Sequence, residues 1–144
     1  MSRADRKEGV KLDESLRKKY IPMTETIYYT LLSVTVPRHG YAIMRHVNEL
    51  TKGRLTLGTG TLYTMVGRLA QDGVIAALPG EEKKTYRITE AGMELLGEET
   101  KRLVKQLSDG IFVLGGVSHG QDMAGVQAWQ SSEAPAAENP GWKG

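Results

Sequence analysis

The residues with the clearest chemical potential lie in a segment near the middle of the chain that has helical spacing. Leu62, Val66 and Leu69 recur at intervals of four and three, which is typical of the buried face of a helix. The opposite face carries small or hydrogen-bonding residues, with Tyr63 at its edge: Gly60, Thr61, Thr64, Gly67, Arg68 and Gln71. A face with no acid and little bulk can approach base edges and phosphates closely. This segment is a candidate nucleic-acid-reading helix.

Catalytic and metal-binding chemistry has little support in the rest of the chain. There is no Cys, which excludes thiolate metal sites, disulfides and a cysteine nucleophile. The three histidines, His39, His46 and His119, do not supply the three or four convergent ligands of a metal site. Glu98 and Glu99 are adjacent and would point in different directions on a helix, so they are interpreted as a solvated face. We expect no cofactor, no metal and no enzymatic activity.

Positive charge is concentrated in the middle of the chain. The 144 residues carry a net charge of only +2, but residues 38–87 hold eight Lys or Arg against four acids. The segments 88–109 and 110–144 are each net −2. A polyanionic partner would be attracted to the middle segment alone. No apolar run approaches the roughly 18 residues of a membrane span, and no signal-peptide core is present, so we predict a soluble, cytoplasmic protein without a membrane partner.

The elements that would position these residues follow from apolar periodicity. It predicts three short helices, over residues 24–35, 41–51 and 60–72. Thr24 and Thr59 are the predicted N-caps of the first and third helices. Two strand-like runs, 74–78 and 85–88, predict a β-hairpin with Lys83 and Lys84 at its charged tip. Three helices followed by a hairpin is the layout of a winged helix-turn-helix, whose third helix enters the major groove of DNA.

The flanking segments have other predicted roles. Residues 1–22 form either a basic N-terminal arm or a short helix, and both readings stay open. Residues 89–109 form a predicted helix with a heptad seam that requires a second helix: Met93, Leu96, Thr100, Leu103 and Leu107. An isolated helix of this length is marginal in water, so we predict a homodimer through this seam. Gly110 should end the helix, and the composition of residues 110–144 predicts a disordered tail.

Four stretches of the chain carry motifs: MTETIYYTLLSV, HGYAI, LTLGTGTLYTMVGRLAQDGVI and KKTYRITEAG. Their combination over residues 17–109 resembles the PadR family of bacterial transcriptional regulators. The resemblance implies a dimeric DNA-binding repressor whose C-terminal helix pairs with a second protomer. It also implies that a small-molecule effector loosens the grip on DNA. By position it places Thr61 and Tyr63 against DNA, and it gives backbone contacts to Tyr41, Lys83, Lys84 and Tyr86.

The sequence therefore predicts a mainly α-helical winged helix-turn-helix domain over residues 23–88, followed by a dimerisation helix. The expected function is transcriptional regulation, as a repressor, at a two-fold related site in double-stranded DNA. The predicted DNA-binding residues are Tyr41, Thr59, Gly60, Thr61, Tyr63, Thr64, Arg68, Lys83, Lys84 and Tyr86. An alternative of a different class is a winged protein-interaction module that does not read DNA, because a fold alone does not fix function.

Overall fold

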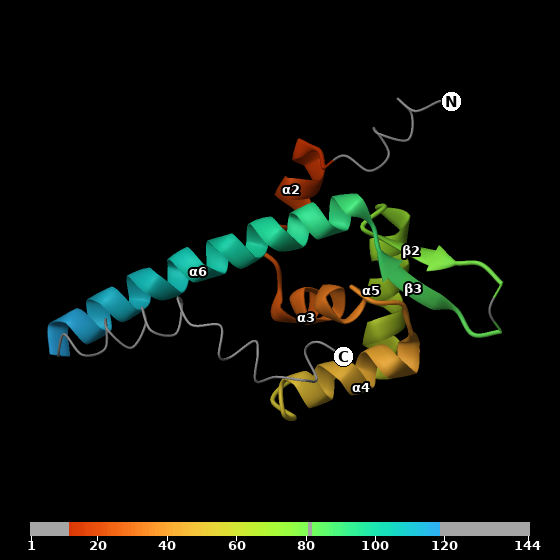
Figure 1. Ribbon diagram of the computed structural model, residues 1–144, viewed down its shortest axis with the longest axis horizontal. Coiled ribbons are helices and arrows are strands. Elements are labelled where there is room, and N and C mark those ends of the chain that lie inside the picture. The colour runs from red at the N-terminus through yellow and green to blue at the C-terminus, as the bar shows by residue number, and fades with distance from the viewer. Residues whose placement is uncertain (1–11, 81, 119–144) are drawn as a thin grey trace. The chain divides into compact units, whose positions relative to one another are not determined.

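The winged domain consists of short helices and one small sheet in the computed structural model of the chain, which describes residues 12–80 and 82–118 (Figure 1). The described helices are α2 (Glu14–Tyr20), α3 (Glu25–Ser33), α4 (Gly40–Leu50), α5 (Thr59–Gln71) and α6 (Glu90–Ser118). The strands are β1 (Arg38–His39), β2 (Ile75–Leu78) and β3 (Thr85–Ile88). The chain divides into two units, Met1–Glu99 and Thr100–Gly144, and the winged domain lies in the first. The predicted fold class is confirmed.

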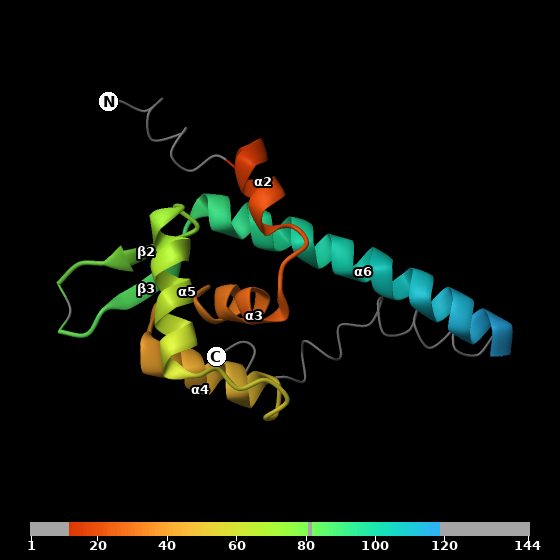
Figure 2. The same cartoon turned by 180° about the vertical axis from the view of Figure 1, so that it is seen from behind.

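The helices α3, α4 and α5 enclose the hydrophobic core and lie together in both Figure 1 and Figure 2. Leu31 from α3, Ile43 from α4 and Leu62 from α5 have no exposed surface. Full burial of each such side chain stabilises the fold by about 1.5–3 kcal/mol relative to leaving it in water. The face of α5 that carries Leu62 and Leu69 is therefore fixed inward, and its opposite face must point away from the core.

The predicted helix starts are correct for α3 but wrong for α5. Thr24 caps α3, because its hydroxyl Oγ1 accepts a hydrogen bond from the Ile27 amide at 3.2 Å. At α5 the N-cap is Gly58, without a side-chain cap, and Thr59 is already inside the first turn. Glycine is accepted at an N-cap almost as readily as threonine, so propensity alone does not choose between the two positions.

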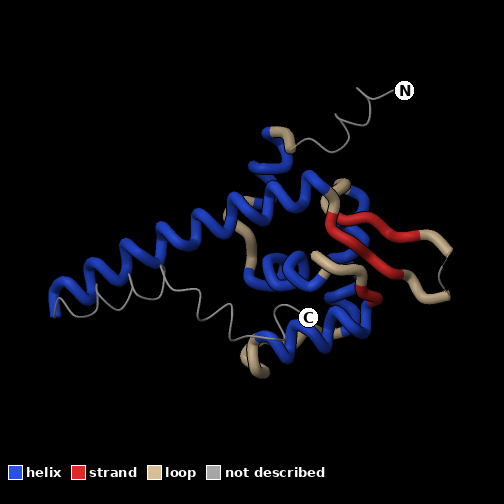
Figure 3. The backbone as a smooth tube through the Cα atoms, in the orientation of Figure 1, coloured by secondary structure: helices blue, strands red, loops and turns tan. Residues whose placement is uncertain are grey.

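The wing is a three-stranded antiparallel sheet with the order β1-β3-β2 (Figure 3). The hairpin pairs Ala77 with Tyr86, and Gly80 in its turn has a φ of 85°, which glycine adopts without strain. The hairpin is as predicted. Strand β1 is an addition: it pairs Arg38 with Tyr86 and so joins the start of α4 to the wing.

The junction between the wing and α6 explains the ITEAG part of the motif. The Thr89 hydroxyl accepts a hydrogen bond from the Gly92 amide at 3.1 Å, which caps α6, and lies 2.6 Å from the Gly73 carbonyl oxygen, to which it donates. A Cβ at Gly92 would lie 2.1 Å from the Val74 carbonyl oxygen. Only glycine lets α6 start this close to the strand, since any other residue would force the backbone apart.

The segment before the winged domain contains the helix α2, and residues 1–11 of the predicted arm lie outside the described residues. Tyr20 is 2% exposed and joins the core. The Arg17 guanidinium contacts the Glu98 carboxylate at 3.0 Å, and Glu99 is 1% exposed. The expectation that Glu98 and Glu99 form a solvated face was therefore wrong. Adjacent helix positions differ by about 100° in direction, so one can bind an arginine at the surface while the other points inward.

The helix α6 is longer than predicted and does not end at Gly110. A glycine inside a helix costs about 1 kcal/mol relative to alanine, which long flanking helical segments can offset. The apolar residues Ile111 to Leu114 continue the helix toward Ser118. The rest of the predicted disordered tail, residues 119–144, lies outside the described residues. Within the described ranges, no helix has the length and apolar character needed to cross a membrane.

Candidate nucleic-acid interface

The outward face of α5 is small, polar and free of acids. The side chains of Leu62, Val66 and Leu69 are buried, as the apolar periodicity predicts. Met65 is buried as well, in addition to the predicted face. The residues predicted to read nucleic acid are all exposed: Thr59, Gly60, Thr61, Tyr63, Thr64 and Arg68. Gly67 and Gln71 lie on the same exposed surface. This geometry leaves a helix face that another molecule can approach without meeting a negative charge.

Tyr63 is positioned by the first residue of α4. A Cβ built at Gly40 would lie 2.3 Å from the Tyr63 hydroxyl oxygen and 2.7 Å from its ring carbon Cζ. The HGY and GTLY motifs are therefore one structural unit, in which the missing side chain of Gly40 makes room for the Tyr63 ring. Tyr63 remains 49% exposed. The ring is held on one side and open on the other.

Tyr86 has a different place from the one expected for a DNA contact. Its side chain is only 7% exposed and belongs to the hydrophobic core. Burial raises the pKa of Tyr86, and the nearby Tyr63 raises it further. Little of the Tyr86 side chain is open to a partner, and its contact with the DNA backbone stays a prediction.

Tyr41 follows Gly40 and lies on the surface, with 59% of its side chain exposed. The Arg45 guanidinium carbon lies 5.9 Å from the centre of the Tyr41 ring, in the range of a cation–π contact. Arg45 also forms an ion pair with Glu49 at 3.6 Å. Sequence reasoning did not single out Arg45, although its spacing of four residues from Tyr41 indicates a shared helix face.

The C-terminal end of α5 is held by Asp72. Its carboxylate accepts a hydrogen bond from the Tyr20 hydroxyl at 2.6 Å and contacts the Lys19 ammonium at 2.7 Å. These hydrogen bonds, first from Lys19 and then from Tyr20, hold the pKa of Asp72 below its ordinary value. Arg68 is exposed, and its charge also lowers the pKa of Asp72. The Asp72 carboxylate is therefore held mainly by Lys19 and Tyr20, with a smaller electrostatic contribution from Arg68.

The wing tip carries Lys83 and Lys84, which are both exposed. Neither forms an ion pair with another described residue, and Glu81 lies outside the described residues. Two mobile ammonium groups on a turn suit contact with phosphate rather than with specific base edges.

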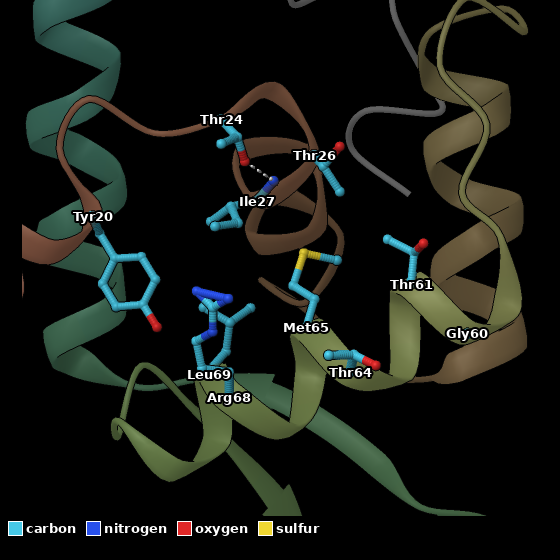
Figure 4. Close-up of a pocket in the computed structure, with 10 residues that line it drawn as sticks. All are labelled: Tyr20, Thr24, Thr26, Ile27, Gly60, Thr61, Thr64, Met65, Arg68 and Leu69. Carbon is cyan, nitrogen blue, oxygen red and sulfur yellow. Dashed lines mark hydrogen bonds between the residues drawn. The ribbon is translucent and has the colours of Figure 1, made fainter.

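A pocket of 530 Å³ lies beside the outward face of α5 (Figure 4). Thr61, Thr64 and Arg68 line it from α5. Thr26 and Ile27 line it from α3. Sequence reasoning did not identify this second wall, because nothing in the residue pattern shows that the start of α3 faces α5. Among the described residues no cluster of three or more His, Asp or Glu side chains has the arrangement of a metal site.

The residues of the predicted dimer seam divide into two groups. Leu96 is 5% exposed and belongs to the core of its own unit, so it offers no free surface. Met93 and Leu107 are 47% and 46% exposed, and Thr100 is also exposed, whereas Leu103 is half-buried. Farther along α6, Phe112 is 62% exposed. Free apolar surface on α6 therefore comes from positions other than Leu96.

Comparisons with known proteins agree with this geometry. Residues 30–98 match the sequence model of the transcriptional regulator PadR-like family. Residues 30–98 belong to the PadR-like family. This matched region spans the C-terminal end of α3, α4, α5, the wing and the start of α6, and so includes both sides of the Gly40–Tyr63 contact. The resemblance inferred from the motifs is confirmed for this part of the chain.

Solved structures similar to the PadR-like domain include two from bacterial species. A transcriptional regulator from Clostridium thermocellum is 25% identical, with a TM-score of 0.50 over 59% of this chain and 91% of that chain. A PadR family transcriptional regulator from Eggerthella lenta is 26% identical, with a TM-score of 0.48 over 69% and 81% of the two chains. The protein hsRosR-S1 is 17% identical, with a TM-score of 0.54 over 81% and 96%, and shares the fold. A search of curated protein sequences found no match to this chain.

Proposed function

We propose that this PadR-like regulator is a dimeric repressor that binds a two-fold related site in double-stranded DNA and responds to a small-molecule effector. The observation that carries the DNA part is the exposed, acid-free face of α5. Small side chains there allow close approach, and Arg68 supplies a planar guanidinium that matches the acceptors of guanine in the major groove.

Three groups of residues would divide the work of binding. Thr61, Thr64 and Arg68 read base edges from α5, with Thr59 and Gly60 at its start close to phosphate. Tyr63 and Tyr41 flank this helix and contact the sugar-phosphate backbone. Lys83 and Lys84 add sequence-independent attraction from the wing.

Dimerisation through α6 would place two such domains on one duplex. Its support is the apolar surface that α6 leaves exposed at Met93 and Leu107. Met93, Thr100, Leu103 and Leu107 follow one another at intervals of seven, three and four residues, which keeps them on one side of the helix as paired helices require. A symmetric dimer selects a symmetric operator, with half-sites about one helical turn apart.

Selection of bound duplexes from a random pool tests this function directly. We expect recovery of a palindromic site, and a slope near −5 when log affinity is plotted against log salt, from about six neutralised phosphates at roughly −0.9 each. The matched control is a scrambled duplex of the same length. Recovery of random sequences with a flat salt response would instead favour a winged protein-interaction module.

A further inference from the structure

The helix α2 is short, and contacts with the rest of its unit hold it in place. A helix of seven residues is not stable by itself in water. Asp13 caps its start, where the side chain accepts a hydrogen bond from the Leu16 amide at 3.0 Å. Leu12, just before the helix, and Tyr20, at its end, are 6% and 2% exposed and belong to the hydrophobic core. The position of α2 is therefore fixed at both ends.

One contact of α2 is made with α6. The Arg17 guanidinium donates to both carboxylate oxygens of Glu98, with Nε at 3.1 Å from each oxygen and Nη2 at 3.0 Å from Oε2. The planar guanidinium fixes the direction of such a contact as well as its length. Glu98 lies eight residues after Glu90, which is about 12 Å along α6 at 1.5 Å per residue. The contact therefore holds α6 two turns beyond its start, which Thr89 and Gly92 fix against the wing.

A second contact of α2 is made with the end of α5. Lys19 and Tyr20 both contact the carboxylate of Asp72, the residue that follows α5. Figure 1 shows α2 beside the first turns of α6, where the Arg17–Glu98 contact joins the two helices. A seven-residue helix thus connects the helix proposed to read DNA with the helix proposed to dimerise.

We propose that α2 is a brace between α5 and the first part of α6, and that its Arg17–Glu98 contact sets the separation of half-sites that the dimer accepts. The inference rests on the proposed function, because only a dimer on a two-fold related site has a half-site separation. Each base pair added between half-sites moves one of them by about 3.4 Å and turns it by about 34–36° around the duplex. A dimer can follow this shift only if α6 changes its direction relative to α5. The brace opposes that change, so Arg17 acts as a positioning residue.

Duplexes with constant half-sites, whose separation changes in steps of one base pair, test this role by fluorescence anisotropy on the full chain. The parent should bind best at one separation and lose affinity on either side of it. In Arg17→Gln the loss at two base pairs from the best separation should shrink by about three- to tenfold, because two partly exposed ion pairs, one in each protomer, no longer oppose the shift. Affinity for a duplex with a single half-site should stay as in the parent. A flat profile in the parent, or a profile in Arg17→Gln as sharp as the parent's, would overturn the proposal.

Two further variants separate the contact from its charge. Lys18→Gln removes the same charge from an exposed position of α2 and should keep the profile of the parent. Glu98→Gln should reproduce Arg17→Gln, and the double variant should resemble either single variant, because both changes break one contact. Effects of the two changes that add up would show that Arg17 and Glu98 act separately, and would overturn the brace.

The brace is also tested without DNA. The chain contains no Cys, so two can be introduced for spin labels, and Gln71→Cys on α5 and Lys105→Cys on α6 use exposed positions. Electron paramagnetic resonance on labelled chains diluted with unlabelled chains gives the distribution of this distance within one chain. The distribution should be broader in Arg17→Gln than in the parent, whereas Lys18→Gln should leave it unchanged.

The two experiments fail in different ways. A distance distribution of equal width in the parent and in Arg17→Gln would overturn the brace, whatever the chain does with DNA. A broader distribution with an unchanged separation profile would overturn the role of the brace in DNA binding. A broader distribution in a chain that binds no duplex would overturn the proposed DNA function and leave the brace standing.

Discussion

The helices α5 and α6 both expose surface to solvent, but their exposed surfaces differ in kind. The helix α5 buries Leu62, Val66 and Leu69 in its own unit and presents threonines, glycines and one arginine outward. From Thr100 onward, α6 instead leaves large apolar side chains exposed, with Leu107 at 46% and Leu114 at 71%. A polar, acid-free face suits a polyanion, whereas exposed apolar side chains at heptad spacing suit a second helix.

The difference also lies in how firmly each surface is held. The ring of Tyr63 lies against Gly40, and the end of α5 is tied to α2 through Asp72. These contacts come from one protomer, so the α5 face is preorganised before any partner arrives. A preorganised face lowers the entropy that must be lost on binding. Four predictions test this contrast.

The largest effect should come from a charge placed on the apolar surface of α6. Leu107→Asp would leave an unpaired carboxylate in the proposed seam, at a cost of about 3–5 kcal/mol per buried charge. We expect analytical ultracentrifugation to show monomers, with the far-ultraviolet circular dichroism of the winged domain retained. Gln106→Asp adds the same charge at the neighbouring exposed position and should stay dimeric. A dimer of undiminished affinity for Leu107→Asp would show that this surface of α6 is not the interface.

A smaller effect is expected where α4 supports α5. In Gly40→Ala the new methyl would overlap the Tyr63 hydroxyl, and such overpacking costs about 1–3 kcal/mol in the free energy of unfolding. The same change on a Tyr63→Ala background should cost almost nothing, so a double-mutant cycle in urea should give a coupling of that size. Gly97→Ala is the control, because a Cβ there meets nothing within 4 Å and should stabilise α6 by up to about 1 kcal/mol. If the losses in the free energy of unfolding from Gly40→Ala and Tyr63→Ala are additive, the two motifs do not form one structural unit.

Substitutions in α5 and in the wing tip, the two elements proposed to contact DNA, should change DNA binding in different ways. Arg68→Ala should reduce the difference in binding free energy between the selected and the random duplex by about 1–3 kcal/mol, since alanine cannot bind a base edge through two hydrogen bonds. The double variant Lys83→Ala, Lys84→Ala should weaken binding to both duplexes alike. It should also reduce the slope of log affinity against log salt by about one for each phosphate that the wing no longer neutralises. Fluorescence anisotropy over a salt series measures both quantities. If the double lysine variant binds like the parent throughout, the wing tip is only a solvated turn.

Periodicity was sufficient to predict the parts of the fold whose signal repeats along the chain. The three helices of the winged domain, its hairpin and the buried face of α5 all follow from apolar spacing, and the motifs identified the family. Strand β1 has only two residues and is defined by its pairing with β3, which a local pattern cannot show. The end of α6 was misplaced because Gly110 was given more weight than the apolar residues that follow it.

The candidate site was harder to predict because it depends on which surfaces face each other. The side chains of β3 point alternately to its two faces, but the sequence does not tell which face of the wing packs on the core, and Tyr86 lies on that face. Leu96 fits a heptad seam equally well as a dimer contact or as a core residue, and it lies in the core. The wall that α3 contributes to the pocket has no sequence signal, since Thr26 and Ile27 lie more than thirty residues from α5.

The smallest effect concerns the anchor at the end of α5 and depends on pH. The hydrogen bonds from Lys19 and Tyr20 lower the pKa of Asp72 in the folded chain, so the carboxylate stabilises the fold above its unfolded pKa of about 4. This stabilisation is lost as the pH falls through the lower folded value. Asp72→Asn should therefore reduce the free energy of unfolding at neutral pH by about 1 kcal/mol, because Lys19 is half-exposed and its ion pair is screened by solvent. The difference between parent and variant should shrink steadily below about pH 4, as measured by urea unfolding across pH. Glu94→Gln removes an exposed carboxylate and should leave the pH profile unchanged. If the difference in unfolding free energy between the parent and Asp72→Asn stays constant down to strongly acidic pH, the contribution of Asp72 to stability comes from packing and not from its charge.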